Sequence, residues 1–244
     1  NLIIGVIAAV NKIPELSFGD VVGSNIFDLS IVVGLAALMS RGGLSSKSRT
    51  VQSSSFFTAG ISLLPLFLIF DGTLSRLDGL ILLFSFICYS AWLFSKKDRF
   101  TKVYDERKDK VGFGRFFKDF LVVTGGIVLL LIGGQGVVQS AMFFYDTFNL
   151  PLGLIGIFVV AIGTCMPELF FSLRAAKCGQ DWMILGNQMG NVAITSTMVL
   201  GVVSIIYPIK IANFEPFAVA RVFLIIAAIA FFLFLRTHQK ISKV

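Results

Sequence analysis

Two acidic residues in this chain stand inside apolar stretches and beside other oxygen-bearing side chains. Glu168 follows the sequence GTCMP at positions 163–167, and Asp28 follows GSNIF at positions 23–27. A carboxylate at the centre of a membrane span costs about 2.5–3.5 kcal/mol, so it normally has a partner or a function. Pro167 has no backbone N–H, which leaves a carbonyl of the preceding turn free. Carboxylate, hydroxyl and carbonyl oxygens are the ligands of hard cations, so these residues predict a cation site.

Polar residues follow a pair of glycines at two places in the chain. The first pair, Gly19 and Gly23, precedes Asp28, and the second pair, Gly186 and Gly190, precedes a polar group made of Asn191, Thr195, Ser196 and Thr197. Small residues four apart let membrane helices pack closely, or they mark interrupted helices beside a binding site. Spacing alone leaves both readings open. Asp20, inside the first pair, either faces a cavity or lies solvated at a helix end.

These residues must be positioned by membrane helices. The chain has 244 residues, of which 56% are hydrophobic and 14% charged, against about 45–50% and 25% in soluble domains. Uninterrupted apolar runs favour helices over barrel strands. We expect an all-α polytopic membrane protein with residues 1–10 as the end of an earlier helix and seven spans, at about 20–39, 53–70, 78–95, 119–138, 152–176, 183–207 and 215–235.

The basic residues predict the orientation. Most of the 21 Lys and Arg residues fall in loops on one side, and only Lys12, Arg76 and Lys210 fall in loops on the other. Because positive loops stay inside, we expect the 96–118 loop and the C-terminal tail in the cytoplasm of a plasma or inner membrane. The net charge of +7 therefore reflects topology and does not indicate nucleic acid. That loop divides the chain into domains at 1–95 and 119–244.

The two halves resemble each other. An offset of 167 positions aligns residues 1–34 with 168–201 without a gap and pairs Gly19 with Gly186 and Gly23 with Gly190. Residues 1–10 are expected to run outward through the membrane and residues 168–177 inward, so the repeats are inverted. Inverted repeats are typical of secondary transporters, whose sites lie near the bilayer midplane.

Several other classes are excluded by composition. One His and three scattered Cys supply neither a four-ligand zinc site nor a disulfide framework. Without a membrane-embedded His, the Ser, Thr and Cys residues lack a base, so an enzyme is not expected. The sequence GGQG at 133–136 lacks the Lys-Ser/Thr of a phosphate loop. We expect no cofactor, with transported cations and the lipid bilayer as partners; the oligomeric state is not indicated.

These motifs resemble the sodium/calcium exchanger membrane family of the cation/calcium antiporters. GTCMPEL at 163–169 is similar to the family's GTSxPEL signature, and GDVVGSNIFD at 19–28 is similar to its GNxxGSNxx(N/D) signature. The resemblance implies two inverted five-helix halves that exchange Na⁺ or H⁺ for Ca²⁺ by alternating access. About eight of the ten helices are expected here, with a helix and a half missing at the start and one at the end.

The resemblance also implies a ligand set for the transported ions. Its members are Glu168 with Thr164 and Cys165 near it, Ser24 and Asp28 with Asn25 beside them, and, by the repeat register, Asn191, Thr195 and Asn1. Asn1 stands where the family has a second acid, which should weaken Ca²⁺ more than Na⁺ because Ca²⁺ affinity depends on ligand charge. Two alternatives remain: an Na⁺/H⁺ exchanger with weak or no Ca²⁺ transport, and a degenerate, non-transporting membrane protein.

Overall fold

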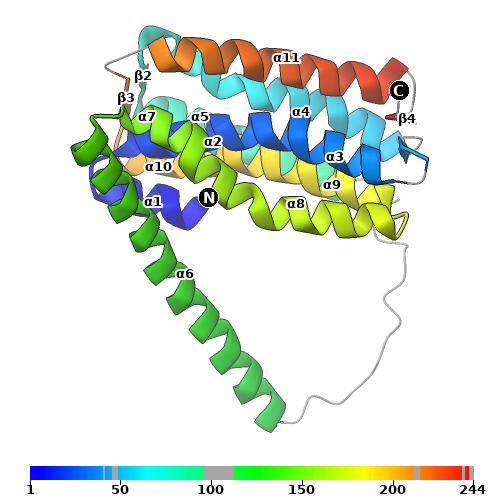
Figure 1. Cartoon of the computed structure of the whole chain (residues 1–244), viewed down its shortest axis with the longest axis horizontal. Helices are drawn as coiled ribbons and strands as arrows, with labels where there is room; N and C mark the ends of the chain where they lie inside the picture. The colour runs from blue at the N-terminus through cyan, green and yellow to red at the C-terminus, as the bar shows by residue number, and fades with distance from the viewer. Residues whose placement is uncertain (41, 46–48, 96–112, 212–214, 238–239, 242–244) are drawn as a thin grey trace.

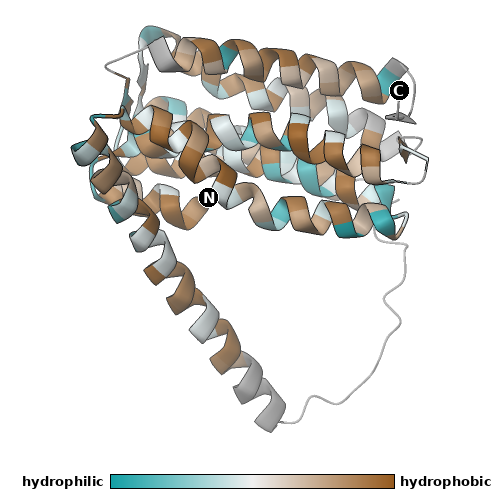
Figure 2. Ribbon diagram, viewed as in Figure 1, coloured by the Kyte–Doolittle hydropathy of each residue, from teal (hydrophilic) through white to brown (hydrophobic). Residues whose placement is uncertain are grey.

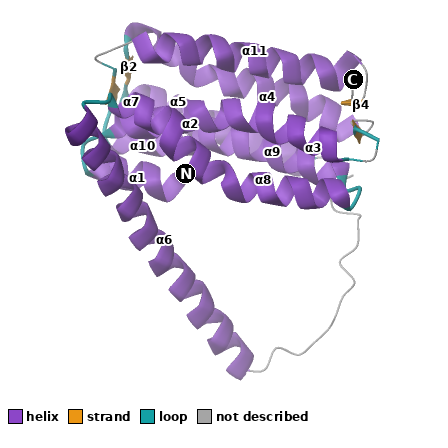
Figure 3. Ribbon diagram, viewed as in Figure 1, coloured by secondary structure: helices purple, strands orange, loops and turns teal. Residues whose placement is uncertain are grey.

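The computed structural model describes residues 1–244 except 41, 46–48, 96–112, 212–214, 238–239 and 242–244. Nearly all of the described chain is helical (Figures 1 and 3). Within the described residues, seven helices are long and apolar enough to cross a membrane: Pro14–Met39, Ser54–Asp71, Arg76–Phe94, Phe120–Phe148, Leu152–Lys177, Asp181–Ile206 and Phe217–Arg236. The predicted all-α membrane fold is confirmed, and the span at 53–70 forms despite Pro65 inside it.

The elements follow the chain in two comparable series. The first half contains α1 (Leu2–Val10), α2 (Pro14–Phe27), the π-helical η1 (Asp28–Val32), α3 (Val33–Met39), β1 (Leu44–Ser45), α4 (Arg49–Leu68), η2 (Ile69–Asp71), β2 (Thr73–Leu74) and α5 (Arg76–Phe94). The second half contains α6 (Phe113–Phe148), α7 (Leu152–Leu154), the π-helical η4 (Ile155–Val160), α8 (Ala161–Lys177), α9 (Asp181–Ala193), the π-helical η5 (Ile194–Val199), α10 (Leu200–Ile206), β3 (Ile209–Lys210), α11 (Glu215–Thr237) and β4 (Lys240–Ile241).

The repeat seen in the sequence continues through the structure. Adding 167 to the bounds of α3 gives those of α10, and adding it to those of β2 gives those of β4. The π-helical segments η1 and η5 also correspond, to within one residue at the start. Figure 1 shows α2–η1–α3 and α9–η5–α10 running in opposite directions across the bundle. These two segments therefore run antiparallel to each other.

Short strand pairs join the two halves. β1 pairs with β4 and β2 with β3, both antiparallel, and Figure 1 shows β2 and β3 at one end of the bundle and β4 at the other. Each pair takes one strand from each half, so backbone hydrogen bonds tie the repeats together at both ends.

The helix α6 begins the second half and leans away from the bundle (Figure 1). It begins at Phe113, within the range expected for the 96–118 loop, of which residues 96–112 lie outside the described part. Its apolar side chains are largely exposed, such as Leu129 at 71% and Ile132 at 65%. Figure 2 shows hydrophobic residues along both α6 and α11. Such surfaces suit contact with lipid.

The first glycine pair forms a tight helix crossing. A Cβ added to Gly19 would lie 2.5 Å from the carbonyl oxygen of Gly153, and one added to Gly23 would lie 2.2 Å from that of Ile157. The helix α2 continues unbroken past both glycines, so the alternative of an interrupted helix is wrong at this place. Close packing is the role of this pair, since only glycine lets the two backbones approach so nearly.

Candidate functional site

Asp28 lies at the point where α2 widens into η1. Its side chain is fully buried, and Asn191 Nδ2 at the end of α9 donates to Asp28 Oδ2 over 2.6 Å. The carboxylate comes from the first repeat and the amide from the second. The residues that the sequence placed at the site in each half therefore meet in space.

Asn25 connects the same two segments by a second pair of hydrogen bonds. Its Nδ2 donates to Ser196 Oγ over 2.7 Å, and its Oδ1 accepts from Thr195 Oγ1 over 2.8 Å. Asn25 is 1% exposed, and Thr195 and Ser196 are equally buried. This network fixes the Thr195 hydroxyl between α2 and η5.

Replacing Asn25 by Ala is expected to destabilise the bundle by about 1–3 kcal/mol, because the buried Ser196 hydroxyl loses its donor and the Thr195 hydroxyl is left with the backbone carbonyls of Asn191 and Val192. The measurement is the midpoint of thermal unfolding in detergent. Ser30→Ala is the control, since the exposed Ser30 hydroxyl bonds only to the carbonyl of Ile26 in its own helix. Equal midpoints for the two variants would show that the Asn25 network contributes nothing to stability.

Asp20 faces the interior of the bundle. Its side chain is fully buried, and Thr164 Oγ1 on α8 donates to Asp20 Oδ1 over 2.9 Å. The alternative of a solvated Asp20 at a helix end is therefore wrong. A signal for this was present in the sequence, because Asp20, Ser24 and Asp28 are spaced by four and so share one face of a helix.

Glu168 lies one turn after Thr164, directly after Pro167 within α8. Its Oε2 atom is buried and has no hydrogen-bond partner among the described residues, and the same holds for Asp28 Oδ1 and Asp20 Oδ2. Buried carboxylates are costly unless a cation or a hydrogen bond compensates them. The arrangement leaves three oxygens available to bind a cation.

Ser24 forms hydrogen bonds through both its side chain and its backbone carbonyl. Its hydroxyl donates to the carbonyl of Val21 over 3.2 Å, and its own carbonyl accepts from Cys165 Sγ over 3.7 Å. Cys165 is fully buried. The Cys165 side chain therefore packs between α2 and α8, next to the candidate ligands Ser24 and Thr164.

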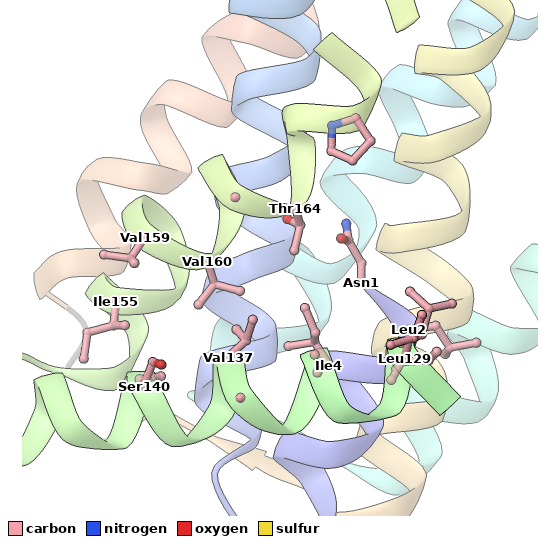
Figure 4. Close-up of a pocket in the computed structure, with 18 of the residues that line it drawn as sticks. Asn1, Leu2, Ile4, Leu129, Val137, Ser140, Ile155, Val159, Val160 and Thr164 are labelled. Atoms are coloured by element: carbon pink, nitrogen blue, oxygen red, sulfur yellow. The ribbon is translucent and has the colours of Figure 1, made fainter. Parts of the chain in front are cut away.

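A cavity of about 1180 Å³ lies between α1, α6 and the η4–α8 segment. Its wall is mainly apolar, but Asn1, Thr164 and Glu168 also line it. Figure 4 shows Asn1 and Thr164 close together, with Leu129, Ile155 and Val159 along other parts of the wall. Asn1 therefore shares a cavity with Glu168, its counterpart in the repeat register.

The described residues contain no group of three or more His, Cys, Asp or Glu side chains able to hold a metal by themselves. A cation here must also use amide, hydroxyl or carbonyl oxygens. Thr164 Oγ1 is such an oxygen beside Asp20, and the amide of Asn191, whose Nδ2 contacts Asp28, carries another. Mixed oxygen ligands of this kind suit hard cations.

Other membrane proteins have similar sequences. The chain is 30% identical over 183 residues to the uncharacterized membrane protein MJ0091 of Methanocaldococcus jannaschii, covering 73% of this chain and 56% of that protein. It is 29% identical over 130 residues to the sodium/calcium exchanger MaX1 of Methanosarcina acetivorans, covering 53% of this chain and 37% of that protein. The chain thus spans less than two thirds of the length of either relative.

The fold is similar to that of the sodium-calcium exchanger NCX_Mj. A structure of that protein soaked with 100 mM Na⁺ and 10 mM Sr²⁺ superposes with a TM-score of 0.69 at 25% identity, covering 99% of this chain and 75% of that one. A second, soaked with 2.5 mM Na⁺ and 0.1 mM Ca²⁺, gives a TM-score of 0.68 at 26% identity.

The sequence pattern of one family matches the chain on both sides of the 96–118 loop. The family is described as sodium/calcium exchanger protein, and the match covers residues 1–95 and 118–244. These two segments include nearly every helix described above and all of the candidate ligands. The fold, the motifs and this match lead to one conclusion: the chain belongs to the sodium/calcium exchanger family.

Proposed function

We propose that this chain forms the ion-binding part of a secondary-active antiporter that exchanges Na⁺ for Ca²⁺. The observation that carries the proposal is the contact of Asp28 with Asn191, which builds one buried site from both inverted repeats. The ligands are Glu168, Asp28, Thr164, Ser24, Asn25, Asn1, Asn191 and Thr195. The transported ions are the substrate, and no cofactor takes part.

The buried carboxylates explain why transport would be an exchange. If the protein exposes the site first to one side of the membrane and then to the other while the carboxylates are uncompensated, the transition costs a large desolvation free energy. A cation bound at Asp28 and Glu168 removes much of that penalty. The protein therefore switches between its inward-open and outward-open states mainly when a cation is bound. This requirement couples the exit of one ion to the entry of another.

Inverted halves provide two related conformations for this movement. If each half can adopt the conformation of the other, the site opens first to one side and then to the other. We place the protein in the plasma or inner membrane with residues 96–118 in the cytoplasm, because most Lys and Arg residues lie in loops on that side.

Na⁺/H⁺ exchange is the second candidate function. It is favoured by Asn1, an uncharged residue that lines the cavity with Glu168. With fewer negative ligands, the site binds a divalent cation less strongly than a site with a second acid at this position.

Flux measurements in proteoliposomes separate these functions. The protein, expressed from its complete gene, is reconstituted with internal Na⁺ and diluted into Na⁺-free buffer that contains radioactive Ca²⁺. The proposal predicts Ca²⁺ uptake that disappears when an ionophore collapses the Na⁺ gradient. A Na⁺-dependent change in an internal pH dye without Ca²⁺ uptake would instead support Na⁺/H⁺ exchange. Absence of both fluxes would contradict transport and favour a non-transporting protein.

A further inference from the structure

Asp20 is a buried acid that the expected ligand set does not include. One of its oxygens accepts the Thr164 hydroxyl, and the other, Oδ2, is buried without a hydrogen-bond partner in the described part of the chain. We propose that Asp20, Thr164 and Glu168 form a second cation subsite between α2 and α8, separate from the subsite at Asp28 and Asn191. This inference rests on the proposed cation site for its place in transport.

The spacing along α2 separates the two subsites. Asp20 and Asp28 are eight residues apart, which corresponds to about 12 Å along a helix at 1.5 Å per residue. A hard cation such as Ca²⁺ contacts its oxygen ligands at about 2.3–2.6 Å, so two ligands of one ion lie within about 5 Å of each other. Each carboxylate also has its own polar partner, Thr164 for Asp20 and Asn191 for Asp28, so we assign the two carboxylates to different cations.

The contacts between α2 and α8 place Glu168 on the side of the second subsite that faces Asp28. Asp20 contacts Thr164, and one turn further along, the Ser24 carbonyl contacts Cys165. The second contact lies closer to the C-terminus than the first on both α2 and α8, so the two helices run parallel. Glu168, one turn beyond Thr164, therefore lies past the level of Asp20 on the side toward Asp28.

A structural role for Asp20 does not require a charge. An Asn side chain offers the same carbonyl oxygen to the Thr164 hydroxyl, so the hydrogen bond explains a polar residue here but not an acid. The negative charge instead adds a third carboxylate to those of Asp28 and Glu168. Three carboxylates can balance one divalent and one monovalent cation at the same time, whereas two cannot.

The test is equilibrium binding of radioactive Na⁺ to the purified full-length protein and to Asp20→Asn. The inference predicts that Asp20→Asn binds one Na⁺ fewer per chain, or binds one Na⁺ at least about tenfold more weakly, while its thermal unfolding midpoint stays unchanged. Asp146→Asn, which alters an exposed acid on α6, should bind as the unaltered protein does. If Asp20→Asn does not fold, Asp20→Ser replaces it, since it also removes the charge and keeps a hydrogen-bonding oxygen.

The outcomes distinguish this inference from the proposed function. If the unaltered protein binds Na⁺ and Asp20→Asn binds the same number with the same affinity, the second subsite is refuted while the site at Asp28 stands. If the unaltered protein binds neither Na⁺ nor Ca²⁺, the proposed function itself is overturned, and the subsite with it.

Discussion

Replacing Glu168 by Gln is expected to reduce Na⁺-driven Ca²⁺ uptake about a hundredfold. The variant keeps the size and the hydrogen-bonding capacity of the side chain but removes its charge from a site that contains few acids. Loss of one charged interaction in a buried site costs up to about 3 kcal/mol, and each 1.4 kcal/mol corresponds to a tenfold change in affinity. The measurement is initial uptake in proteoliposomes at a fixed amount of protein.

Two variants control this experiment. Asp28→Asn is expected to cause a loss of similar size, because Asp28 supplies the other carboxylate of the shared site. Asp146→Asn removes an acid from the exposed part of α6 and should leave uptake unchanged. Uptake by Glu168→Gln equal to that of the unaltered protein would show that Glu168 is not a ligand.

The second large effect concerns the packing that holds the site together. Replacing Gly23 by Ala is expected to destabilise the bundle by about 1–3 kcal/mol or more, which is the usual cost of overpacking a tight interior. The new Cβ would lie 2.2 Å from the Ile157 carbonyl oxygen and 2.7 Å from Ala161 Cβ. The first of these atoms belongs to the backbone, so α2 and η4 must separate. The measurement is size-exclusion chromatography after heating. The temperature at which half of the monodisperse peak is lost is expected to be lower for the variant.

The inverted repeat supplies a matched control for this variant. Gly190 corresponds to Gly23 in the repeat register, yet the described structure has no atom within 4 Å of a Cβ added there. Gly190→Ala should therefore be neutral or slightly stabilising, since Ala has the higher helix propensity. Equal losses of stability in the two variants would contradict the close crossing of α2 and η4.

Much of the fold could be predicted because membrane helices leave a strong signal in composition. Each span is a continuous apolar run, and its length is set by the thickness of the bilayer. The strand pairs could not be predicted, since β1 to β4 have two residues each and too short a pattern to recognise. The widening of the helix at Asp28 was also not predicted, because nothing in the sequence around that residue distinguishes a π-helical turn from an α-helical one.

The sequence selected candidate ligands but not the contacts between them. Motif resemblance selected Asp28 and the repeat register selected Asn191, whereas their hydrogen bond depends on the packing of α2 and η1 against α9. The burial of Asp20 depends in the same way on α8, which is more than a hundred residues further along the chain. The glycine pairs illustrate the same limit, since the repeat register equates Gly23 and Gly190 although only Gly23 lies in a tight crossing.

The most direct test of a midplane cation site built by both repeats is a crystal structure of the protein soaked in Sr²⁺, with the ion located by its anomalous scattering. Sr²⁺ stands in for Ca²⁺ as a hard divalent cation that prefers oxygen ligands. The predicted result is a peak inside the bundle between Asp28 and Glu168, which is lost in Glu168→Gln crystals. A map at saturating Sr²⁺ with peaks only outside the helix bundle would contradict it.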